Sequence, residues 1–373
     1  MSTSSKPLAG IKVLELARIL AGPWAGQLLA DLGAEVLKIE KPGAGDDTRA
    51  WGPPFVEGEN GENLSAAYYH ACNRGKKSLG IDFHKDEGRA QIIALAKDSD
   101  ILIENFKVGS LKKHGLDYES LKKINPRLIY CSITGFGQTG PYAGRAGYDF
   151  MIQGMSGIMS VTGEADGPPL KSGIAIADLF TAHYAVSGIL AALYKRNETG
   201  QGAHLDLSLL DCMMASLANQ GMNYLVSGRA PSRMGNAHPN IVPYEAYPTR
   251  DGHIIIATGS DRQYLDMCDV LGANDLKTNP DFSTNQGRVL HRAVLSPKIA
   301  AYTKKFARDE LLSEFEKKFI PAGPINTIEE AFNDPQVIAR RIHQDLLGVP
   351  TIRCPIVMDG EPLSAGSPSP KLG

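Results

Sequence analysis

Asp178 is the residue whose type and surroundings best suit covalent chemistry. It follows a small, flexible run, 173–177, and precedes a segment, 179–193, whose apolar residues recur at helical spacing. This spacing predicts a helix with Asp178 at its N-terminus, where unpaired N–H groups and aligned peptide dipoles favour negative charge. We therefore expect an ionised carboxylate even where water is excluded, and such a group can act as a nucleophile. Aspartate is also a preferred N-cap residue, so helix capping is the structural alternative.

The composition indicates a soluble protein with more than one core. The chain has 373 residues, of which 43% are hydrophobic, and a net charge of −2. This length suits two domains or one large domain with an insertion, and the balanced charge gives no reason to expect nucleic acid as a partner. The opening, 1–17, lacks the basic start and apolar run of a signal peptide, and no later stretch reaches about 18 uninterrupted apolar residues. We expect a cytoplasmic or otherwise soluble intracellular protein without membrane attachment.

The cysteines and histidines do not suggest a metal centre. The five cysteines are isolated, with no C-x-x-C pair, and the nine histidines are scattered, with no H-E-x-x-H motif. Neither pattern is typical of a disulfide framework or a zinc site. We predict no bound metal.

Alternating strands and helices predict a parallel α/β sheet in the first part of the chain. Such runs are typical of sheets wound with helices, which bind ligands beyond the carboxyl ends of their strands. The loop 21–26 lacks the G-x-G-x-x-G dinucleotide fingerprint, and no G-x-x-x-x-G-K-[ST] motif is present. The predicted strands span 11–17, 34–40, 78–83, 101–104, 127–133 and 204–209, and the predicted helices span 24–32, 87–97, 118–123, 150–159 and 210–226.

Two polar segments follow predicted strands and offer groups to a phosphate or an aromatic ring. In the long Gly/Pro-rich passage 41–64, Lys41 and Arg49 suit phosphate contacts and Trp51 suits ring stacking, although solvated surface is an equally ordinary role for such charges. The turn 105–113 offers an amide, an aromatic ring and ammonium groups. Both segments are therefore candidates for contact with an anionic, ring-containing ligand.

The pattern of predicted elements changes near residue 228, and this change predicts a domain boundary. We assign 1–227 to a large α/β domain and 228–330 to a smaller α+β domain of short strands and helices. The remainder, 331–373, is interpreted as a return segment and tail that pack on the large domain. Its Pro/Ser/Gly-rich end, 364–373, looks like a tail rather than a folded element.

Several segments match one family pattern, in order along the chain. They are LAGIKVLELARILAGPWAGQLLADLGAEVLKIEKPGAGDDTR, NRGKKSLGID, ENFKVGSLKKHGL, INPRLIYCSITGFGQTGP, RAGYD, GPPLKSGIAIADL, ALYKRNETGQGAHLDLSLLD and PAGPINTIEEAF. Together they resemble the class III CoA-transferases of the CaiB/BaiF type, a family that also contains racemases of acyl-CoA thioesters. The resemblance implies a doubly wound, Rossmann-like large domain and an interlocked homodimer with its active site between the large and small domains.

By position, the resemblance implies that Asp178 is the catalytic nucleophile. It also implies that CoA and acyl-CoA are substrates and that no cofactor is bound permanently. Lys113 falls where relatives commonly have arginine, and Lys41 where some do, which keeps the charge but loses the bidentate fork. The residues that we assign to binding CoA or the acyl substrate are Arg18, Ala21, Lys41, Ile81, Phe83, Asn105, Phe106, Lys113, Arg145 and Tyr148.

Tyr148 separates two reactions within the family. The resemblance implies that the racemases have a histidine at this position, which moves the proton α to the thioester. A phenol is a poor proton shuttle at neutral pH. CoA transfer through aspartyl anhydride and aspartyl-CoA thioester intermediates therefore fits better. The alternatives are an acyl-CoA racemase and a non-catalytic acyl-CoA-binding protein.

The substrates are expected to be small carboxylic acids and their CoA thioesters. Segments 43–55, 130–141 and 240–247 look most like family members that use dicarboxylates, with succinyl-CoA or a similar donor. A dicarboxylate acceptor calls for a cation at its distal carboxylate. The candidates are Arg18, Arg145 and His238.

Overall fold

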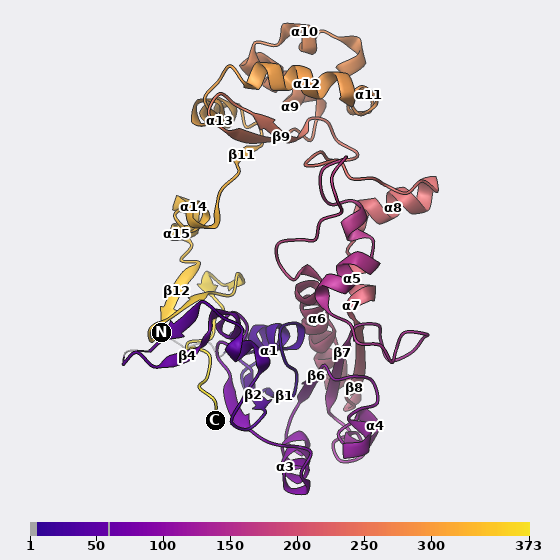
Figure 1. The fold of residues 1–373 in the computed structure, drawn as a ribbon, viewed down its shortest axis with the longest axis vertical. Helices are drawn as coiled ribbons and strands as arrows, with labels where there is room; N and C mark the ends of the chain where they lie inside the picture. Colours follow the sequence, from indigo (N-terminus) through magenta and orange to yellow (C-terminus); the bar gives the residue numbers. More distant parts are fainter. Residues whose placement is uncertain (1–5, 59) are drawn as a thin grey trace. The chain divides into compact units, whose positions relative to one another are not determined.

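The computed structural model of the chain describes residues 6–58 and 60–373 (Figure 1). Residues 1–5, part of the opening considered for a signal peptide, and residue 59, inside the long polar passage, lie outside the described residues. The chain divides into two compact units. The large unit comprises Met1–Ile158, Lys171–Ala218 and Pro335–Gly373, and the small unit comprises Met159–Leu170 and Asn219–Asp334.

These units do not follow the expected boundaries in every detail. The first boundary falls after Ala218, earlier than expected, and the last falls after Asp334, slightly later than expected. The segment Met159–Leu170, expected in the large domain, groups with the small unit. There the N–H of Gly235 donates a hydrogen bond to the carbonyl of Gly163 at 3.0 Å. Sequence periodicity could not reveal this pairing, because the partners are far apart in the chain.

A parallel sheet forms the centre of the large unit, which confirms the predicted α/β class. Among the described residues it has six strands, in the order β5-β2-β1-β6-β7-β8, and each neighbouring pair is parallel. The winding direction reverses between β1 and β6, and open α/β sheets bind ligands at such a reversal. The strands are β1 (Lys12–Glu15), β2 (Glu35–Glu40), β5 (Lys77–Gly80), β6 (Ile101–Glu104), β7 (Ile129–Thr134) and β8 (Ala203–Ser208).

Helices cover both faces of this sheet (Figure 1). Those of the large unit are α1 (Ala21–Asp31), α2 (Ala67–His70), α3 (Asp86–Lys97), α4 (Tyr118–Leu121), α5 (Asp149–Met155), α6 (Ile176–Thr199) and α7 (Leu209–Ala215). Successive strand residues point to opposite faces. Val13 packs with α1 and α6, whereas Leu14 packs with α3 and α4. The central strands β1, β6 and β7 are therefore buried between two apolar layers, as is typical of parallel sheets.

Helix α6 is long and apolar enough, by length and composition alone, to cross a membrane. Its side chains Ala182, Ala185 and Ile189 are buried in the same core as α1 and one face of the sheet. A core helix of a globular unit passes the same test. The composition of α6 is therefore weak support for a membrane span.

The small unit is built on an antiparallel sheet. Its strands, in the order β11-β10-β9, are β9 (Tyr244–Pro248), β10 (His253–Ala257) and β11 (Ala322–Pro324). The helices that accompany them are α8 (Ala218–Ser227), α9 (Asp261–Leu271), α10 (Asn274–Lys277), α11 (Asn285–Leu290), α12 (Arg292–Thr303), α13 (Arg308–Lys317) and α14 (Ile328–Phe332). Tyr247, Ile254 and Phe315 share one buried core, so this unit has its own hydrophobic centre.

The last segment of the chain packs within the large unit. Its elements are α15 (Pro335–Ala339), β12 (His343–Leu346), β13 (Val349–Ile352), β14 (Val357–Met358) and β15 (Glu361–Pro362). Residues 364–373 form no helix or strand, but they are not a free tail. The N–H of Gly75 donates to the carbonyl of Ser367 at 3.1 Å, and the N–H of Gly80, on the outer strand β5, donates to the carbonyl of Gly373 at 3.0 Å.

Two other predicted elements differ from the structure. The passage 41–64 is not one long loop, because it contains a 3-10 turn (Asp47–Ala50) and a hairpin of β3 (Phe55–Glu57) and β4 (Asn63–Ala66). The predicted helix 210–226 is two helices, α7 and α8. Ala218, at the start of α8, has a φ of 47°, a left-handed backbone that interrupts the helix. Apolar periodicity continues across this break and therefore does not reveal it.

Four buried charges lie beneath the carboxyl end of β1. The Nζ of Lys38 lies 3.1 Å from Glu15 Oε1 and 3.0 Å from Asp46 Oδ2, and the Nζ of Lys76 lies 2.8 Å from Glu15 Oε2. Burial alone would lower the pKa of Lys38, but the carboxylates of Glu15 and Asp46 outweigh burial and hold that pKa above its usual range. Removing one member of such a cluster leaves a buried charge without its partner.

Replacing Asp46 by asparagine is expected to lower the free energy of unfolding by about 3 kcal/mol, the low end for breaking a buried pair, because Glu15 still faces Lys38. The matched control is Asp47→Asn. Its carboxylate pairs with Arg18 at 3.2 Å, but the side chains are 54% and 52% exposed, and such pairs contribute about 0–1 kcal/mol. Urea denaturation measures the free energy of unfolding of both variants. Equal losses would contradict the structural role of the buried pair.

Candidate active site

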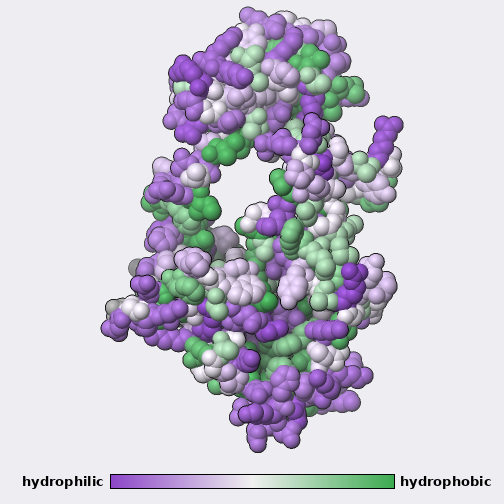
Figure 2. All heavy atoms as spheres, in the orientation of Figure 1, coloured by the Kyte–Doolittle hydropathy of each residue, from purple (hydrophilic) through white to green (hydrophobic). Residues whose placement is uncertain are grey.

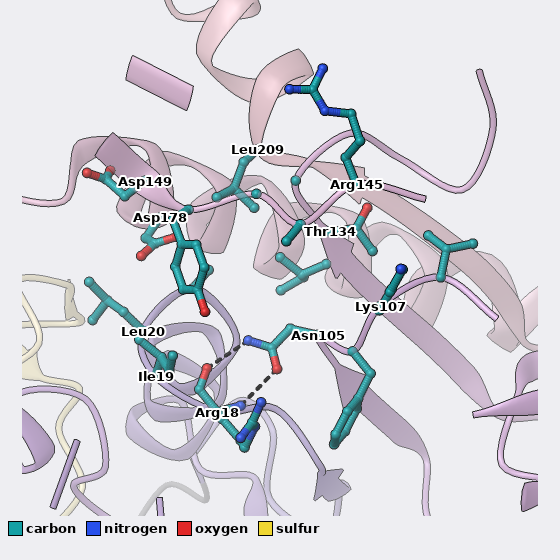
Figure 3. A pocket seen from close by; sticks show the side chains of 18 of the residues that line it. Arg18, Ile19, Leu20, Asn105, Lys107, Thr134, Arg145, Asp149, Asp178 and Leu209 are labelled. Atoms are coloured by element: carbon teal, nitrogen blue, oxygen red, sulfur yellow. Dashed lines mark hydrogen bonds between the residues drawn. The ribbon is translucent and has the colours of Figure 1, made fainter. Parts of the chain in front are cut away.

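A cavity of about 370 Å³ lies beyond the carboxyl ends of β1, β6 and β7 in the large unit (Figure 3). It lies where the strand order reverses, the place at which sheets of this kind bind ligands. The charged residues that line it are Arg18, Lys107, Arg145, Asp149 and Asp178.

The Asp178 side chain lies on this cavity, in the first turn of α6. The helix begins at Ile176, after the N-cap residue Ala175, whose side chain makes no capping bond. The predicted helix is therefore confirmed, but its start at Asp178 is wrong. Asp149 takes the capping role, because its Oδ1 accepts a hydrogen bond from the N–H of Ala177 at 2.8 Å. Within the described part of the chain, no group donates a hydrogen bond to the Asp178 carboxylate.

The ionisation of Asp178 also differs from the expectation. Burial and, second, the neighbouring Asp149 carboxylate raise the pKa of Asp178 to about 7. Figure 3 shows the two side chains together on one side of the cavity. The N-terminus of α6 does not keep this group acidic, since Asp149 occupies the N–H of Ala177. Both the protonated and the ionised form of Asp178 are therefore accessible near neutral pH, and the ionised form is poorly solvated.

Replacing Asp178 by asparagine is expected to stabilise the fold more at pH 8 than at pH 5. The folded-state pKa of about 7 lies above the ordinary value of 3.8. The folded protein therefore binds this proton more tightly than the unfolded chain, and the resulting stability is lost as the pH rises from about 4 to about 7. An amide does not titrate and avoids this loss. Thermal denaturation at the two pH values measures the difference, and an equal gain at both would contradict the raised pKa.

The turn after β1 is held from two sides. The Asn105 side chain accepts a hydrogen bond from the N–H of Arg18 at 2.9 Å and donates one to the Arg18 carbonyl at 2.7 Å, as the dashed lines in Figure 3 show. The Asp46 carboxylate, paired with Lys38, accepts from the N–H of Ile19 at 3.1 Å. Ile19 has a φ of 72°, which is uncommon for a β-branched residue. These bonds therefore maintain a strained turn on the cavity wall.

This geometry changes the interpretation of Asn105. The residue lines the cavity, as its assignment to CoA binding requires, but its side-chain amide is used on the backbone of Arg18. The Asn105 side chain therefore positions the turn that carries Arg18. Sequence reasoning missed Asp46 and Asp149, because an acidic residue in a glycine-rich loop or before a helix has no distinctive spacing.

A second cavity, of about 600 Å³, lies next to the first in the large unit. The two share Arg18, Phe106 and Ser110 in their walls. The second cavity also brings together residues from the end of β2, the segment that follows β5 and the basic turn after β6. Those assigned to CoA by position are Arg18, Lys41, Ile81, Phe83, Phe106 and Lys113.

Aromatic rings gather in this second cavity. The ring centroids of Phe83 and His84 lie 4.7 Å apart, those of His84 and His114 lie 5.2 Å apart, and those of Phe83 and Phe106 lie 5.5 Å apart. Sequence reasoning marked the phenylalanines and missed both histidines, since a lone histidine carries no signal. A cluster of flat rings beside lysines suits a purine that bears phosphate groups.

The other assigned residues line the first cavity. They are Ala21, Asn105, Arg145, Tyr148 and Asp178. Three residues considered in the sequence line neither cavity. His238 belongs to the small unit, the guanidinium of Arg49 pairs with Glu40 at 2.7 Å, and the ring of Trp51 packs edge-on against Tyr68.

A close backbone contact fixes the loop that carries Arg145, Tyr148 and Asp149. Gly147 lies so near Gly135 that a Cβ atom on either would come within 2.5–2.6 Å of the Cα of the other. Only glycine permits this approach. The contact ties the loop before α5 to the end of β7 and so fixes part of the cavity wall.

The cysteines form no disulfide, and the described residues form no cluster typical of a metal centre. The five cysteines are buried and unpaired. Within residues 6–58 and 60–373, no group of three or more His, Cys, Asp or Glu side chains is arranged to hold a metal ion.

Comparison with known proteins shows similarity along the whole chain. The sequence pattern of CoA-transferase family III matches residues 8–373. The chain is 56% identical over 378 residues to a succinate–glutarate CoA-transferase of Agrobacterium fabrum, which covers 100% of this chain and 94% of the relative. It is 40% identical over 375 residues to a mouse succinyl-CoA:glutarate CoA-transferase, with 99% of this chain and 85% of the relative covered.

The fold is similar to that of a solved relative as well. A crystal structure of a CaiB/BaiF family protein from Brucella suis superimposes with a TM-score of 0.88 and 56% sequence identity, over 99% of this chain and 97% of that one. Sequence pattern, full-length relatives and fold agree. The chain therefore belongs to CoA-transferase family III and is a class III CoA-transferase.

Proposed function

We propose that this enzyme uses Asp178 as a covalent nucleophile to move CoA from succinyl-CoA to a dicarboxylic acid such as glutarate. The observation that carries the proposal is the Asp178 carboxylate, which lines a cavity, lacks a hydrogen-bond donor among the described residues and has a pKa of about 7. Such a group is poised to attack a carbonyl carbon at neutral pH. The two substrates are those named for the relatives from Agrobacterium fabrum and mouse.

The first half of the reaction loads CoA onto the enzyme. The ionised Asp178 carboxylate attacks the thioester carbonyl of the donor, so that an oxygen–carbon bond forms, the carbon–sulfur bond breaks and CoA thiolate leaves. The product is a mixed anhydride of Asp178 and the donor acid. CoA thiolate then attacks the Asp178 carbonyl, which gives an aspartyl-CoA thioester and releases the donor as a carboxylate.

The second half repeats these steps with the acceptor. The acceptor carboxylate attacks the aspartyl thioester, which releases CoA thiolate and forms a new anhydride. CoA thiolate then attacks the acceptor carbonyl of that anhydride, which yields the product thioester and restores the Asp178 carboxylate. One thioester replaces another. The N–H of Ala21, at the start of α1 on the cavity wall, has no helical partner and is a suitable donor to the tetrahedral oxyanions.

The two adjacent cavities suit the two ends of CoA. In this proposal the rings of Phe83, His84 and His114, which pack together, contact the adenine, and Lys41 and Lys113, which line the same cavity, contact phosphates. The pantetheine arm then runs past Phe106, which both cavities share, towards Asp178. The strand order and the helices on both faces support a doubly wound, Rossmann-like large unit, in which this path crosses the reversal between β1 and β6.

The active enzyme is proposed to be a homodimer. Apolar side chains are exposed on helices α5, α6 and α7, and Figure 2 shows green, hydrophobic surface over α5 and α7. Exposed apolar patches of this kind mark association surfaces. Light scattering of the purified protein at micromolar concentration tests the dimer. The large apolar residues exposed on α5, α6 and α7 are Phe150, Met151, Met155, Phe180, Tyr184, Leu190, Tyr194 and Met214.

A cytoplasmic location of the enzyme stays a prediction.

The test of the proposed function is transfer of CoA between acids. Incubation with succinyl-CoA and glutarate should give glutaryl-CoA and succinate in equal amounts, by chromatography and mass analysis. A parallel incubation with a 2-methylacyl-CoA in deuterated water tests racemisation, which Tyr148 does not favour. Deuterium uptake at the α carbon without transfer would overturn the proposal in favour of a racemase. CoA binding with neither reaction would indicate a non-catalytic binding protein.

A further inference from the structure

Phe106 lines three cavities of the large unit. Two are those of the proposed CoA path, and the third has a volume of about 240 Å³. The Phe106 ring packs edge-on against Phe83, with 5.5 Å between centroids, and the Arg18 guanidinium lies 5.7 Å from its centroid. A ring that borders open space has fewer packing contacts than one inside a core. Hydrogen bonds to the backbone of Phe106 therefore matter for its position.

The Glu104 carboxyl supplies such a hydrogen bond. Glu104 ends β6 and is 5% exposed. Its Oε2 accepts a hydrogen bond from the N–H of Phe106 at 2.8 Å. Asn105, between the two, uses its side chain on the backbone of Arg18. The end of β6 is therefore tied both to the turn after β1 and to the residue that the three cavities share.

Polar groups on the neighbouring strands hold the Glu104 carboxyl. Ser132 lies opposite Glu104 on β7, is 1% exposed and hydrogen-bonds to its carboxyl. The Ser132 Oγ also lies 3.0 Å from the Nε2 of His204 on β8. A hydroxyl has one hydrogen to donate, so Ser132 donates to Glu104 and accepts from the His204 ring. The carboxyl is thus fixed from strands outside the turn that it supports.

Glu104 is buried in a place where it cannot take part in the chemistry. Leu102 packs in the core with α3 and α4, whereas Ile103 packs in the core with α6. Because strand residues alternate, the Glu104 side chain shares the face of Leu102 and points away from the helix that carries Asp178. Burial of a carboxyl costs stability unless hydrogen bonds compensate it. Its bond to Phe106 gives this buried group a function.

We infer that Glu104 is a positioning residue for CoA, whose carboxyl oxygen holds the Phe106 backbone and so sets the passage between the two cavities of the CoA path. The inference rests on the proposed function, from which it takes that path. It assigns to Glu104 an effect on the binding of CoA and acyl-CoA rather than on the chemical steps. It also requires an oxygen that accepts a hydrogen bond, and not a negative charge.

The test compares two substitutions of Glu104 by calorimetry with free CoA and by initial rates with succinyl-CoA and glutarate. Glu104→Met has a similar volume but only a weakly accepting sulfur. It should raise the Kd for CoA and the KM for succinyl-CoA by about tenfold, the size of one lost hydrogen bond, and leave kcat near the wild-type value. Glu104→Gln keeps an acceptor oxygen and should bind CoA as the wild type does.

Tyr130→Phe is the matched control. Tyr130 lies on the adjacent strand and on the same face of the sheet, and its hydroxyl donates to the Leu116 carbonyl at 2.9 Å. The variant loses a buried hydrogen bond that does not touch the turn. It should be less stable in urea and keep the wild-type Kd and KM. If Glu104→Met does not fold, Ser132→Ala replaces it, because loss of the hydroxyl that fixes the carboxyl should also raise the Kd.

Three results would overturn the inference. One is a wild-type Kd and KM in Glu104→Met, or a wild-type Kd in Ser132→Ala where that variant replaces it. Another is a Glu104→Gln protein that binds CoA as weakly as Glu104→Met, since the charge would then be decisive. The third is an equal rise of the Kd in Tyr130→Phe, which would indicate a general loss of stability. A wild type that binds CoA but transfers it to no acid removes the proposed function alone, and calorimetry then decides the inference.

Discussion

Replacing Asp178 by asparagine is expected to lower the rate of CoA transfer by about 10⁴-fold or more, because the amide has no nucleophilic oxygen anion and removal of a covalent nucleophile has effects of this size. The measurement is the initial rate of glutaryl-CoA formation from succinyl-CoA and glutarate. The fold and CoA binding should survive, since the amide is nearly isosteric and the cap of α6 is supplied by Asp149.

The control for this variant is Glu198→Gln, which neutralises an exposed carboxylate at the other end of the same helix. It should transfer CoA at the parent rate. An Asp178→Asn protein that binds CoA and retains more than a tenth of the parent rate would contradict a covalent role for this residue.

The second large effect is a fall in rate at acid pH. In the proposed mechanism only the ionised Asp178 attacks, and burial and Asp149 raise its pKa to about 7. We therefore expect kcat/KM for the acyl-CoA to fall about tenfold for each pH unit below that value. Burial is the main cause of the raised pKa and Asp149 the second. Asp149→Asn removes the second cause and should move the acid limb to lower pH. The asparagine oxygen can still accept the N–H of Ala177, so the cap of α6 is retained.

Profiles of kcat/KM between pH 5 and pH 9 measure this effect for the wild type, Asp149→Asn and Glu198→Gln. The last variant should keep the wild-type profile. An acid limb near pH 4 in the wild type would show that the cavity does not raise the pKa of Asp178. An acid limb in Asp149→Asn that coincides with that of the wild type would show that the two carboxylates are not coupled.

The sheet and many of the residues that line the two cavities could be predicted from the sequence because their signals are local. Short apolar runs such as Ile101–Glu104 form buried parallel strands, and ligands bind where such strands end. The residues that follow those ends, including Arg18 and Asn105, line the first cavity. Lys41 and Lys113 line the second.

The state of Asp178 could not be predicted, because it depends on a residue distant in sequence. Asp149 occupies the N–H of Ala177 and places a second carboxylate beside Asp178. The helix dipole, which the sequence does reveal, is outweighed by burial and by this neighbour. Local spacing alone therefore predicted an ionised Asp178, whereas burial and Asp149 raise the pKa of this residue.

The hydrogen bonds that hold the turn after β1 could not be predicted either, because they also join residues that are distant in sequence. Asp46 bonds to the N–H of Ile19 and pairs with the buried Lys38, and these three residues lie on separate segments. The chain end gives a similar lesson, since residues 364–373 are polar and rich in proline but hydrogen-bond to Gly75 and Gly80. Composition indicates where a chain lacks regular structure, but it does not show whether that segment is docked.

The central claim is a covalent bond between Asp178 and CoA. Its most direct test is to mix the enzyme with succinyl-CoA, quench with hydroxylamine or borohydride, and locate the modification by peptide mass analysis. The account predicts a hydroxamate or a reduced alcohol on the side chain of Asp178, and no such product without succinyl-CoA or in Asp178→Asn. A wild type that transfers CoA with Asp178 unmodified, or modified at another carboxylate, would contradict the account.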